Sequence, residues 1–461
     1  MYGLSEPGYG GDSTRYLAVA KNILFNNCVS TADPLSGICT PHWGGNQFPG
    51  YPLLIALAGW LAGLGIQDGM AEFTPAVIIL QSLVMAAVVY RVGRAVTIFS
   101  GSYFMGYGAA LVAGFSPLHF AWSRWILTES FSTAITMWLL AELLVCLKKR
   151  RLDIFPVAIP LIAGFFVRYD SITLCAAVAA TGFILHRPAE AIRRGSLIAV
   201  LLAIPIIGWS ARNVDRGLTV MPMADYGVGH MKGQGYYDWL GTWVEDLYNA
   251  AAAAYPISSR KYSKIVVPDR IYLNPEEADR TKLLLAELSL LDGKEMPHWI
   301  EKEFARLGKE RISNDPLGIK VVLPLKRTAN IYLAPFYSYG WVIELGEASH
   351  RAWIDRDTAA LTNIVLGAPL TIGLKIVVAA YHVLVLLVFL GLLAGMRRKS
   401  RLWQPFLVIS AYVAAKTAFV VFLGQADPRL TIQPYAVMEL AILLALWNFR
   451  EIQFPWTRLR K

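Results

Sequence analysis

A single carboxylate near the start of the chain has the setting of a reactive acid. Asp12 stands between a glycine pair and a helical run over residues 16–25, within Tyr9-Gly10-Gly11-Asp12-Ser13-Thr14-Arg15-Tyr16. A positioned carboxylate can take a proton from a substrate hydroxyl, but an Asp before a helix also commonly caps the first free amides. The octapeptide alone favours the cap. The catalytic interpretation therefore depends on what the rest of the chain places beside Asp12.

Isolated basic residues recur at short connections between apolar runs, where several of them facing one space would bind an anion. A guanidinium matches phosphate oxygens with two hydrogen bonds, and charges at membrane depth are costly unless they pair or line a cavity. For each residue the alternative is a local pair, as Arg168 could make with Asp170, or a side chain that extends to lipid headgroups. Together they predict a phosphate site formed by Arg124, Arg168, Arg212, Arg429 and Lys375.

Other polar residues indicate neither a resident metal nor nucleic acid. The seven histidines are scattered without a partner at metal-ligand spacing, so no metal site is predicted. The net charge of +10 comes from short basic clusters between apolar runs, which is typical of cytoplasmic membrane loops. Cys28 and Cys39 share one polar loop and can pair if that loop lies outside the cytosol.

The elements that must position these residues are apolar helices. The chain has 461 residues, of which 55% are hydrophobic and only 16% charged, and its mean hydropathy is +0.44. These values indicate an integral membrane protein. We predict an all-α polytopic bundle of about ten spans, preceded by a shorter juxtamembrane or re-entrant helix at 53–65. The clearest spans are 74–90, 103–118, 125–147, 154–167, 169–185, 197–211, 375–396, 402–424 and 430–449.

This pattern predicts four segments: an outer loop with juxtamembrane helices (1–72), a first bundle (73–211), a mostly helical extracytoplasmic region (212–358) and a C-terminal bundle (359–461). In the outer region, residues 274–291 and 297–312 have helical periodicity with many charges. The apolar run 316–335 carries three basic residues, which suits an interfacial helix on the outer leaflet.

The positions of the basic clusters predict the orientation. They follow alternate spans, at 91–94, 148–151, 187–194, 397–401 and 450–461. The positive-inside rule places such clusters in the cytosol, so Asp12 and the outer region face outside, most simply from a bacterial inner membrane. No helix precedes Asp12 to carry it across. We therefore expect a further span upstream of the given sequence, with direct translocation of the short tail as the alternative.

Two opposite charges lie inside the predicted C-terminal spans. Lys416 is about eight residues, and Glu439 about nine, from the outer end of neighbouring antiparallel helices. At about 1.5 Å per residue the two side chains share a depth. We therefore predict a structural ion pair between them.

Several of these motifs, in this order, resemble the dolichyl-phosphate-mannose protein mannosyltransferase superfamily, whose members have the GT-C fold. The resemblance covers most of the chain, although each motif is short. It rests on Gly11-Asp12…Tyr16, Pro49-Gly50-Tyr51-Pro52, Thr128-Glu129, Arg168 after Gly164, Trp209…Arg212-Asn213 with Gly217, and Trp299-Ile300 followed by Asn314-Asp315-Pro316. The chain departs from the family in lacking a first span. It also has one Asp where many relatives have an Asp-Glu pair.

The resemblance implies a membrane glycosyltransferase that uses a sugar on a polyprenyl phosphate and a lipid, polysaccharide or protein acceptor. Asp12 would be the general base for an inverting transfer, with Glu129 as a positioning carboxylate. Arg168, Arg212 and Arg429 would stabilise the departing phosphate. Some members use a divalent ion.

Two other classes remain open. A transporter or flippase for a lipid-linked anionic sugar would use the same basic cavity without a base at Asp12, although the chain has no paired broken helices in matching halves. A membrane scaffold with a sensory outer region would leave the outward arginines without a role.

Overall fold

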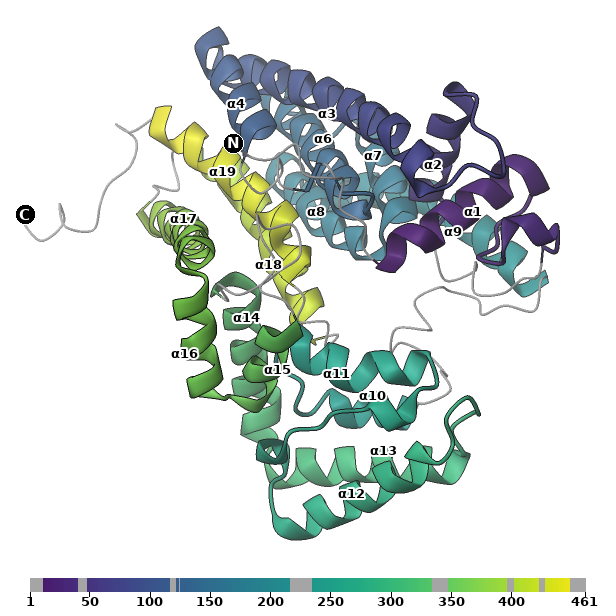
Figure 1. Ribbon diagram of the computed structural model, residues 1–461. Coiled ribbons are helices and arrows are strands. Elements are labelled where there is room, and N and C mark those ends of the chain that lie inside the picture. Colours follow the sequence, from purple (N-terminus) through teal and green to yellow (C-terminus); the bar gives the residue numbers. More distant parts are fainter. Residues whose placement is uncertain are drawn as a thin grey trace, which may run out of the picture. The chain divides into compact units, whose positions relative to one another are not determined.

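The computed structural model describes residues 11–39, 48–116, 122–123, 125–215, 234–333, 347–395, 402–422 and 428–447. All regular elements in these ranges are helices (Figure 1). Five of them are long and apolar enough to cross a membrane: α3 (Met70–Ser100), α6 (Thr128–Lys149), α9 (Pro188–Asp215), α17 (Pro369–Gly395) and α18 (Trp403–Phe422). The protein is therefore a helical membrane protein, as the composition predicts.

Shorter apolar helices complete the bundle. They are α2 (Gly50–Leu61), α4 (Tyr103–Phe115), α7 (Ile154–Val167), α8 (Leu174–Leu185), α16 (Thr358–Gly367) and α19 (Ile432–Trp447). A 3-10 turn, η2 (Tyr169–Thr173), joins α7 to α8, and another, η7 (Pro428–Thr431), leads into α19. The number of spans, about ten from the sequence, stays a prediction.

Two basic clusters lie within helices rather than in the connections where the sequence analysis placed them. α3 continues through Arg91 and Arg94 to Ser100. The Arg91 guanidinium donates two hydrogen bonds to Glu142 of α6, at 2.7 and 2.5 Å. The helix continues because its backbone hydrogen bonds do not depend on side-chain polarity, while Glu142 neutralises the arginine. Similarly, α9 begins at Pro188, ahead of the basic pair at 193–194.

The chain divides into two compact units. Unit 1 comprises residues 1–222, 383–416 and 432–461, and unit 2 comprises residues 223–382 and 417–431. Within unit 1, α6 is buried on almost every side, with α3, α7 and α19 packed against it, while α4 lies along α3 (Figure 1). Because α6 is the centre of the unit, residues at its N-terminal end such as Thr128 and Glu129 are buried.

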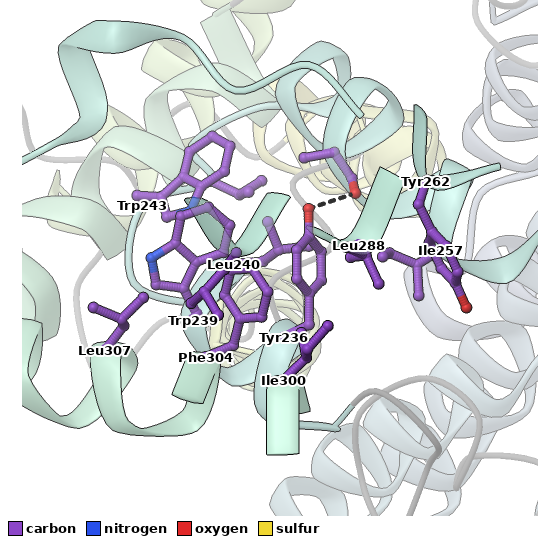
Figure 2. Close-up of a cluster of buried hydrophobic side chains, with 13 residues drawn as sticks. Tyr236, Trp239, Leu240, Trp243, Ile257, Tyr262, Leu288, Ile300, Phe304 and Leu307 are labelled. Carbon is purple, nitrogen blue, oxygen red and sulfur yellow. Dashed lines mark hydrogen bonds between the residues drawn. The ribbon is translucent and has the colours of Figure 1, made fainter. Parts of the chain in front are cut away.

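Unit 2 has an aromatic core built from residues between 236 and 307. α10 (Gln234–Leu240), α11 (Leu247–Ser258), α12 (Pro275–Ser289) and α13 (His298–Asn314) supply most of it. Figure 2 shows Trp239 beside Phe304, with ring centroids 5.2 Å apart, and the Tyr236 hydroxyl bonded to the Ala253 carbonyl at 3.1 Å. Aromatic pairs of this kind stabilise unit 2 beyond the effect of the apolar area that they bury.

The outer helices form where the sequence predicts them. Asn274 caps α12 by accepting a hydrogen bond from the Glu277 amide at 2.8 Å, and α13 follows as expected. The run predicted to be interfacial contains η6 (Gly318–Val322), a π-helical stretch that continues into α14 (Leu323–Leu333). One further short helix, α15 (Glu347–Asp355), precedes α16.

Candidate functional site

The Asp12 carboxylate is half exposed at the start of the first helix. The structure describes α1 as Gly11–Asn26, so Asp12 lies in its first turn. This position favours a negative charge because the amides of the first turn make the helix end positive. Among the described residues, its ion-pair partner is Arg15, whose Nη1 lies 4.0 Å from Oδ1, and the Asp12 side chain is 44% exposed. A substrate can therefore reach the carboxylate.

The first two turns of α1 pack against the rest of unit 1. The buried Ser13 hydroxyl donates to the Ile126 carbonyl at 2.8 Å, just before α6 begins. The Tyr16 ring meets the Tyr51 ring of α2 edge-on, with centroids 5.3 Å apart. Tyr51 is fully buried, and its hydroxyl lies 3.1 Å from Gln81 Oε1. These contacts fix the helix that carries Asp12 against the N-terminal ends of α2 and α6.

A buried network of four charged side chains lies at the junction of α6 and α7. Arg168 donates through Nη1 to Thr128 Oγ1 at 2.8 Å and to Glu129 Oε1 at 3.0 Å. Its Nε donates to Asp170 Oδ1 at 3.3 Å. The other oxygen of Asp170 accepts from Lys416 Nζ of α18 at 2.5 Å. This network brings together segments that lie up to almost 290 residues apart in the sequence (Thr128 to Lys416).

The charges in this network balance. Arg168 and Lys416 carry two positive charges, and Glu129 and Asp170 two negative charges. Glu129, Asp170 and Lys416 are each no more than 3% exposed, whereas the Arg168 side chain is 16% exposed. Unpaired charges would be strongly unfavourable at such sites, and the desolvation of each group is offset only by its partners. Arg168 therefore pairs locally with Asp170, which is the alternative that the sequence left open.

Gly50 lets the Pro-Gly-Tyr-Pro segment at 49–52 pack against the junction of α6 and α7. A Cβ atom at Gly50 would lie 2.6 Å from the Phe166 carbonyl oxygen, which is too close for any other residue without a backbone shift. Beside it, the Phe48 ring contacts Phe165 and Phe166 edge-on. The Pro-Gly-Tyr-Pro segment therefore packs directly against the end of α7, two residues before Arg168.

Arg212 lies next to the same end of α7. Its guanidinium stacks over the Trp209 ring at 4.8 Å and donates to the Asn213 side chain at 2.9 Å. A longer hydrogen bond, 3.3 Å, reaches the Val29 carbonyl. Trp209 in turn meets the Phe166 ring edge-on at 6.3 Å. Arg168 and Arg212 therefore lie on elements that pack together, the end of α7 and α9, and their convergence on one phosphate stays a prediction.

The structure does not place the remaining predicted cations relative to this network. Arg124 lies outside the described residues, and Arg429 lies in η7, where its side chain is not described. Lys375 is buried in the second turn of α17, in unit 2. A phosphate role for these three residues stays a prediction.

The partners of Lys416 and Asp170 differ from those that the sequence predicts. Lys416 binds Asp170 rather than Glu439, so the predicted pair within the C-terminal bundle is wrong. Equal depth along two helices does not fix the direction in which a side chain leaves the helix axis, and Lys416 points toward η2. Asp170 was considered only as a local partner of Arg168, although an acid directly beyond a helix end in an apolar setting was a usable signal.

The loop after α1 is closed by a disulfide between Cys28 and Cys39, whose Cα atoms are 6.3 Å apart. The side-chain amide of Asn22, in α1, donates to two carbonyls of this loop, those of Ser30 at 2.8 Å and Ala32 at 2.9 Å. Since Val29 belongs to this loop, the disulfide also holds the carbonyl that Arg212 contacts.

Among the residues that the structure describes, no group of three or more His, Cys, Asp or Glu side chains is arranged to hold a metal ion. No family model, curated protein or solved structure matches the chain. The fold and the site define a helical membrane protein with a charge-balanced cluster at one end of its first bundle.

Proposed function

We propose that the protein is an integral membrane glycosyltransferase that moves a sugar from a polyprenyl-phosphate donor to an acceptor on the non-cytosolic side. One observation carries this proposal: motifs dispersed along the sequence meet at one end of unit 1. Ser13 binds the segment before α6, Arg168 binds Glu129, and the turn with Arg212 packs on Phe166. Asp12, in α1, is the exposed carboxylate of that group.

In the proposed reaction the Asp12 carboxylate takes the proton of an acceptor hydroxyl while the oxygen attacks the anomeric carbon of the donor. The bond between that carbon and the phosphate oxygen breaks, and its electrons stay on the lipid phosphate. Attack from the opposite face inverts the anomeric centre. A positioned base of this kind contributes roughly 10²–10⁴-fold to the rate.

The leaving phosphate needs fixed positive charge more than it needs a proton. Arg212 is the better placed candidate, because it is partly exposed and held flat on Trp209. Arg168 is largely neutralised by Glu129 and Asp170, so we assign it a smaller share in phosphate binding and a larger one in holding Glu129 in place. Arg124, Arg429 and Lys375 complete the predicted set.

The Cys28–Cys39 disulfide supports an outward orientation of the first segment, because disulfides persist mainly in oxidising compartments. The basic clusters at the opposite helix ends agree with this orientation under the positive-inside rule. We therefore propose the bacterial inner membrane as the location, with the site facing away from the cytosol.

A transporter or flippase for a lipid-linked anionic sugar is the second candidate, and the buried charge network favours it. Ionisable side chains inside helical membrane bundles commonly mark ion or substrate pathways. Such a carrier would need Asp170 and Lys416, which lie at the centre of the network, but it would have no need of a base at Asp12.

The test compares Asp12→Asn with Asp33→Asn in vesicles that contain the purified protein, a panel of polyprenyl-phosphate sugars and a membrane fraction as acceptor. Asp33 lies in the same outer segment and caps a short turn, a role that Asn also fills. We expect release of lipid phosphate to fall by roughly 10²–10⁴-fold in Asp12→Asn and to be unchanged in Asp33→Asn. Transfer at the normal rate by Asp12→Asn would refute the catalytic assignment. Movement of the donor across the vesicle without transfer would support the carrier.

A further inference from the structure

The helix formed by η6 and α14 has one face that the protein does not cover. Leu317, Val321, Leu325 and Leu333 are between 46% and 72% exposed. They are spaced four or eight residues apart, so they form one stripe along the helix. This stripe has no described protein neighbour to shield it, which raises the question of what covers it.

The opposite face of α14 is held tightly inside unit 2. Leu323, Arg327 and Ile331, again four residues apart, are each less than 7% exposed. The Arg327 guanidinium donates three hydrogen bonds, to the carbonyls of Gly241 at 2.8 Å, Val244 at 2.8 Å and Val421 at 3.0 Å. The helix therefore cannot roll to bury its exposed stripe without breaking these bonds.

Two of the contacts of α14 show its level along a membrane-spanning helix. Arg327 reaches Val421, and the Tyr332 hydroxyl lies 2.7 Å from Thr417 Oγ1; both partners belong to the last two turns of α18. Thr417 is five residues from the end of α18 at Phe422, which is about 7.5 Å along the axis at 1.5 Å per residue.

That level coincides with the boundary of the hydrocarbon. The 20 residues of α18 span about 30 Å, the thickness of a bilayer core. An outward-facing stripe at the level of the last two turns of such a helix meets the region between headgroups and acyl chains. Lys320, which is exposed, can reach lipid phosphates from there.

We propose that η6 and α14 form an interfacial helix whose apolar stripe is inserted in the headgroup–acyl boundary of the leaflet at the C-terminal end of α18. The occupant of this face is lipid, rather than a second copy of the chain. Its anchor is Arg327, which ties the helix to both the outer core and α18. This inference does not depend on the proposed enzymatic function.

The test is a comparison of spin labels at two leucines of equal exposure. Leu325→Cys lies on the stripe and Leu283→Cys lies on α12, and both native side chains are 63% exposed. Each is introduced into protein in which Ala replaces Cys146 and Cys175, and reconstituted into vesicles of phosphatidylethanolamine and phosphatidylglycerol. Collisions of the label with oxygen and with a water-soluble nickel chelate are then measured.

We expect the ratio of oxygen to nickel accessibility to be several-fold higher at 325 than at 283, because oxygen concentrates in the bilayer and the chelate in water. Equal ratios would overturn the proposal by placing the stripe in water. A label at 325 that neither reagent reaches would overturn it in favour of a protein partner. A second label at Val321→Cys shows whether the result belongs to the stripe rather than to one position.

Discussion

Both units bury an arginine, and they neutralise it in different ways. In unit 1, Arg168 is bound by two carboxylates, one of which is shared with Lys416. In unit 2, Arg327 donates to three main-chain carbonyls, and among the described residues it has no carboxylate partner. The first arrangement is a network of ionisable groups whose charge a ligand or proton can change. In the second arrangement the acceptors are main-chain carbonyls, which do not titrate, so the role of Arg327 is structural.

A third buried arginine shows that ion pairing alone does not mark function. Arg311 of α13 pairs with Glu277 of α12 and also donates to the Ile271 carbonyl at 3.0 Å. This pair connects consecutive helices within unit 2 and, among the described residues, joins no more distant segment of the chain. The network around Arg168 differs because it gathers three distant parts of the chain, and because Ser13, next to the half-exposed Asp12, binds the segment that leads into Glu129. It is the combination of convergence and access that makes it a candidate site.

The largest effect should come from Asp170→Asn. This change removes the negative charge that Arg168 and Lys416 share, replaces one of the two acceptor oxygens with an NH2 donor, and leaves Glu129 as the remaining acid of the network. Loss of one partner from a buried ion pair costs about 3–5 kcal/mol. Thermal unfolding of the purified protein in detergent should show a correspondingly large fall in stability.

The control for this change is Asp279→Asn, which alters an exposed acid on α12 and should leave the unfolding transition in place. The double change Asp170→Asn with Lys416→Met should recover part of the loss, because it restores the balance of charge. A single variant as stable as the unmodified protein would mean that the network contributes nothing and would remove the contrast with Arg327.

A smaller effect is expected from Arg327→Met. Three buried carbonyls lose a charged donor, and hydrogen bonds to charged groups are worth about 1.5–3 kcal/mol. The loss should be local, so amide exchange should accelerate at 241–244 and 417–421 while α6 keeps its protection. Arg306→Met removes a 56% exposed arginine and should change neither region. Equal acceleration throughout α6 would show that Arg327 stabilises more than unit 2.

The smallest effect concerns an acid at the surface of unit 2. Burial opposes ionisation of Glu245, but a hydrogen bond from Arg356 and the charges of Lys326 and Arg270 lower the pKa of its carboxyl. The stabilisation is complete above the unfolded pKa of about 4.3 and is lost as the pH falls through the lower folded value. Its size should be under about 1 kcal/mol.

Amide exchange in α15, which precedes Arg356, should therefore increase as the pH drops below about 4. Glu245→Gln should show less of this increase, since its side chain does not titrate. An identical pH profile in the two proteins would show that Glu245 does not couple α15 to unit 2.

The sequence by itself determined the class of protein and the position of most helices. Apolar runs between basic clusters predicted a helical membrane protein, and helical periodicity over residues 274–291 predicted α12. These features are local: hydrophobicity over a span length and a cap within one turn act on neighbouring residues. The sequence also predicted one site for Glu129, Arg168 and Arg212; the structure pairs Glu129 with Arg168, and a shared role with Arg212 stays a prediction.

Only the tertiary structure decided which charges meet. Depth along the helices predicted Glu439 as the ion-pair partner of Lys416. The Lys416 side chain instead leaves the helix axis toward η2 and pairs with Asp170. The tertiary structure also explains Gly50. A side chain there would clash with the Phe166 carbonyl, which lies more than a hundred residues away in the sequence. Side-chain direction and close backbone approach depend on how helices pack, and no local pattern encodes them.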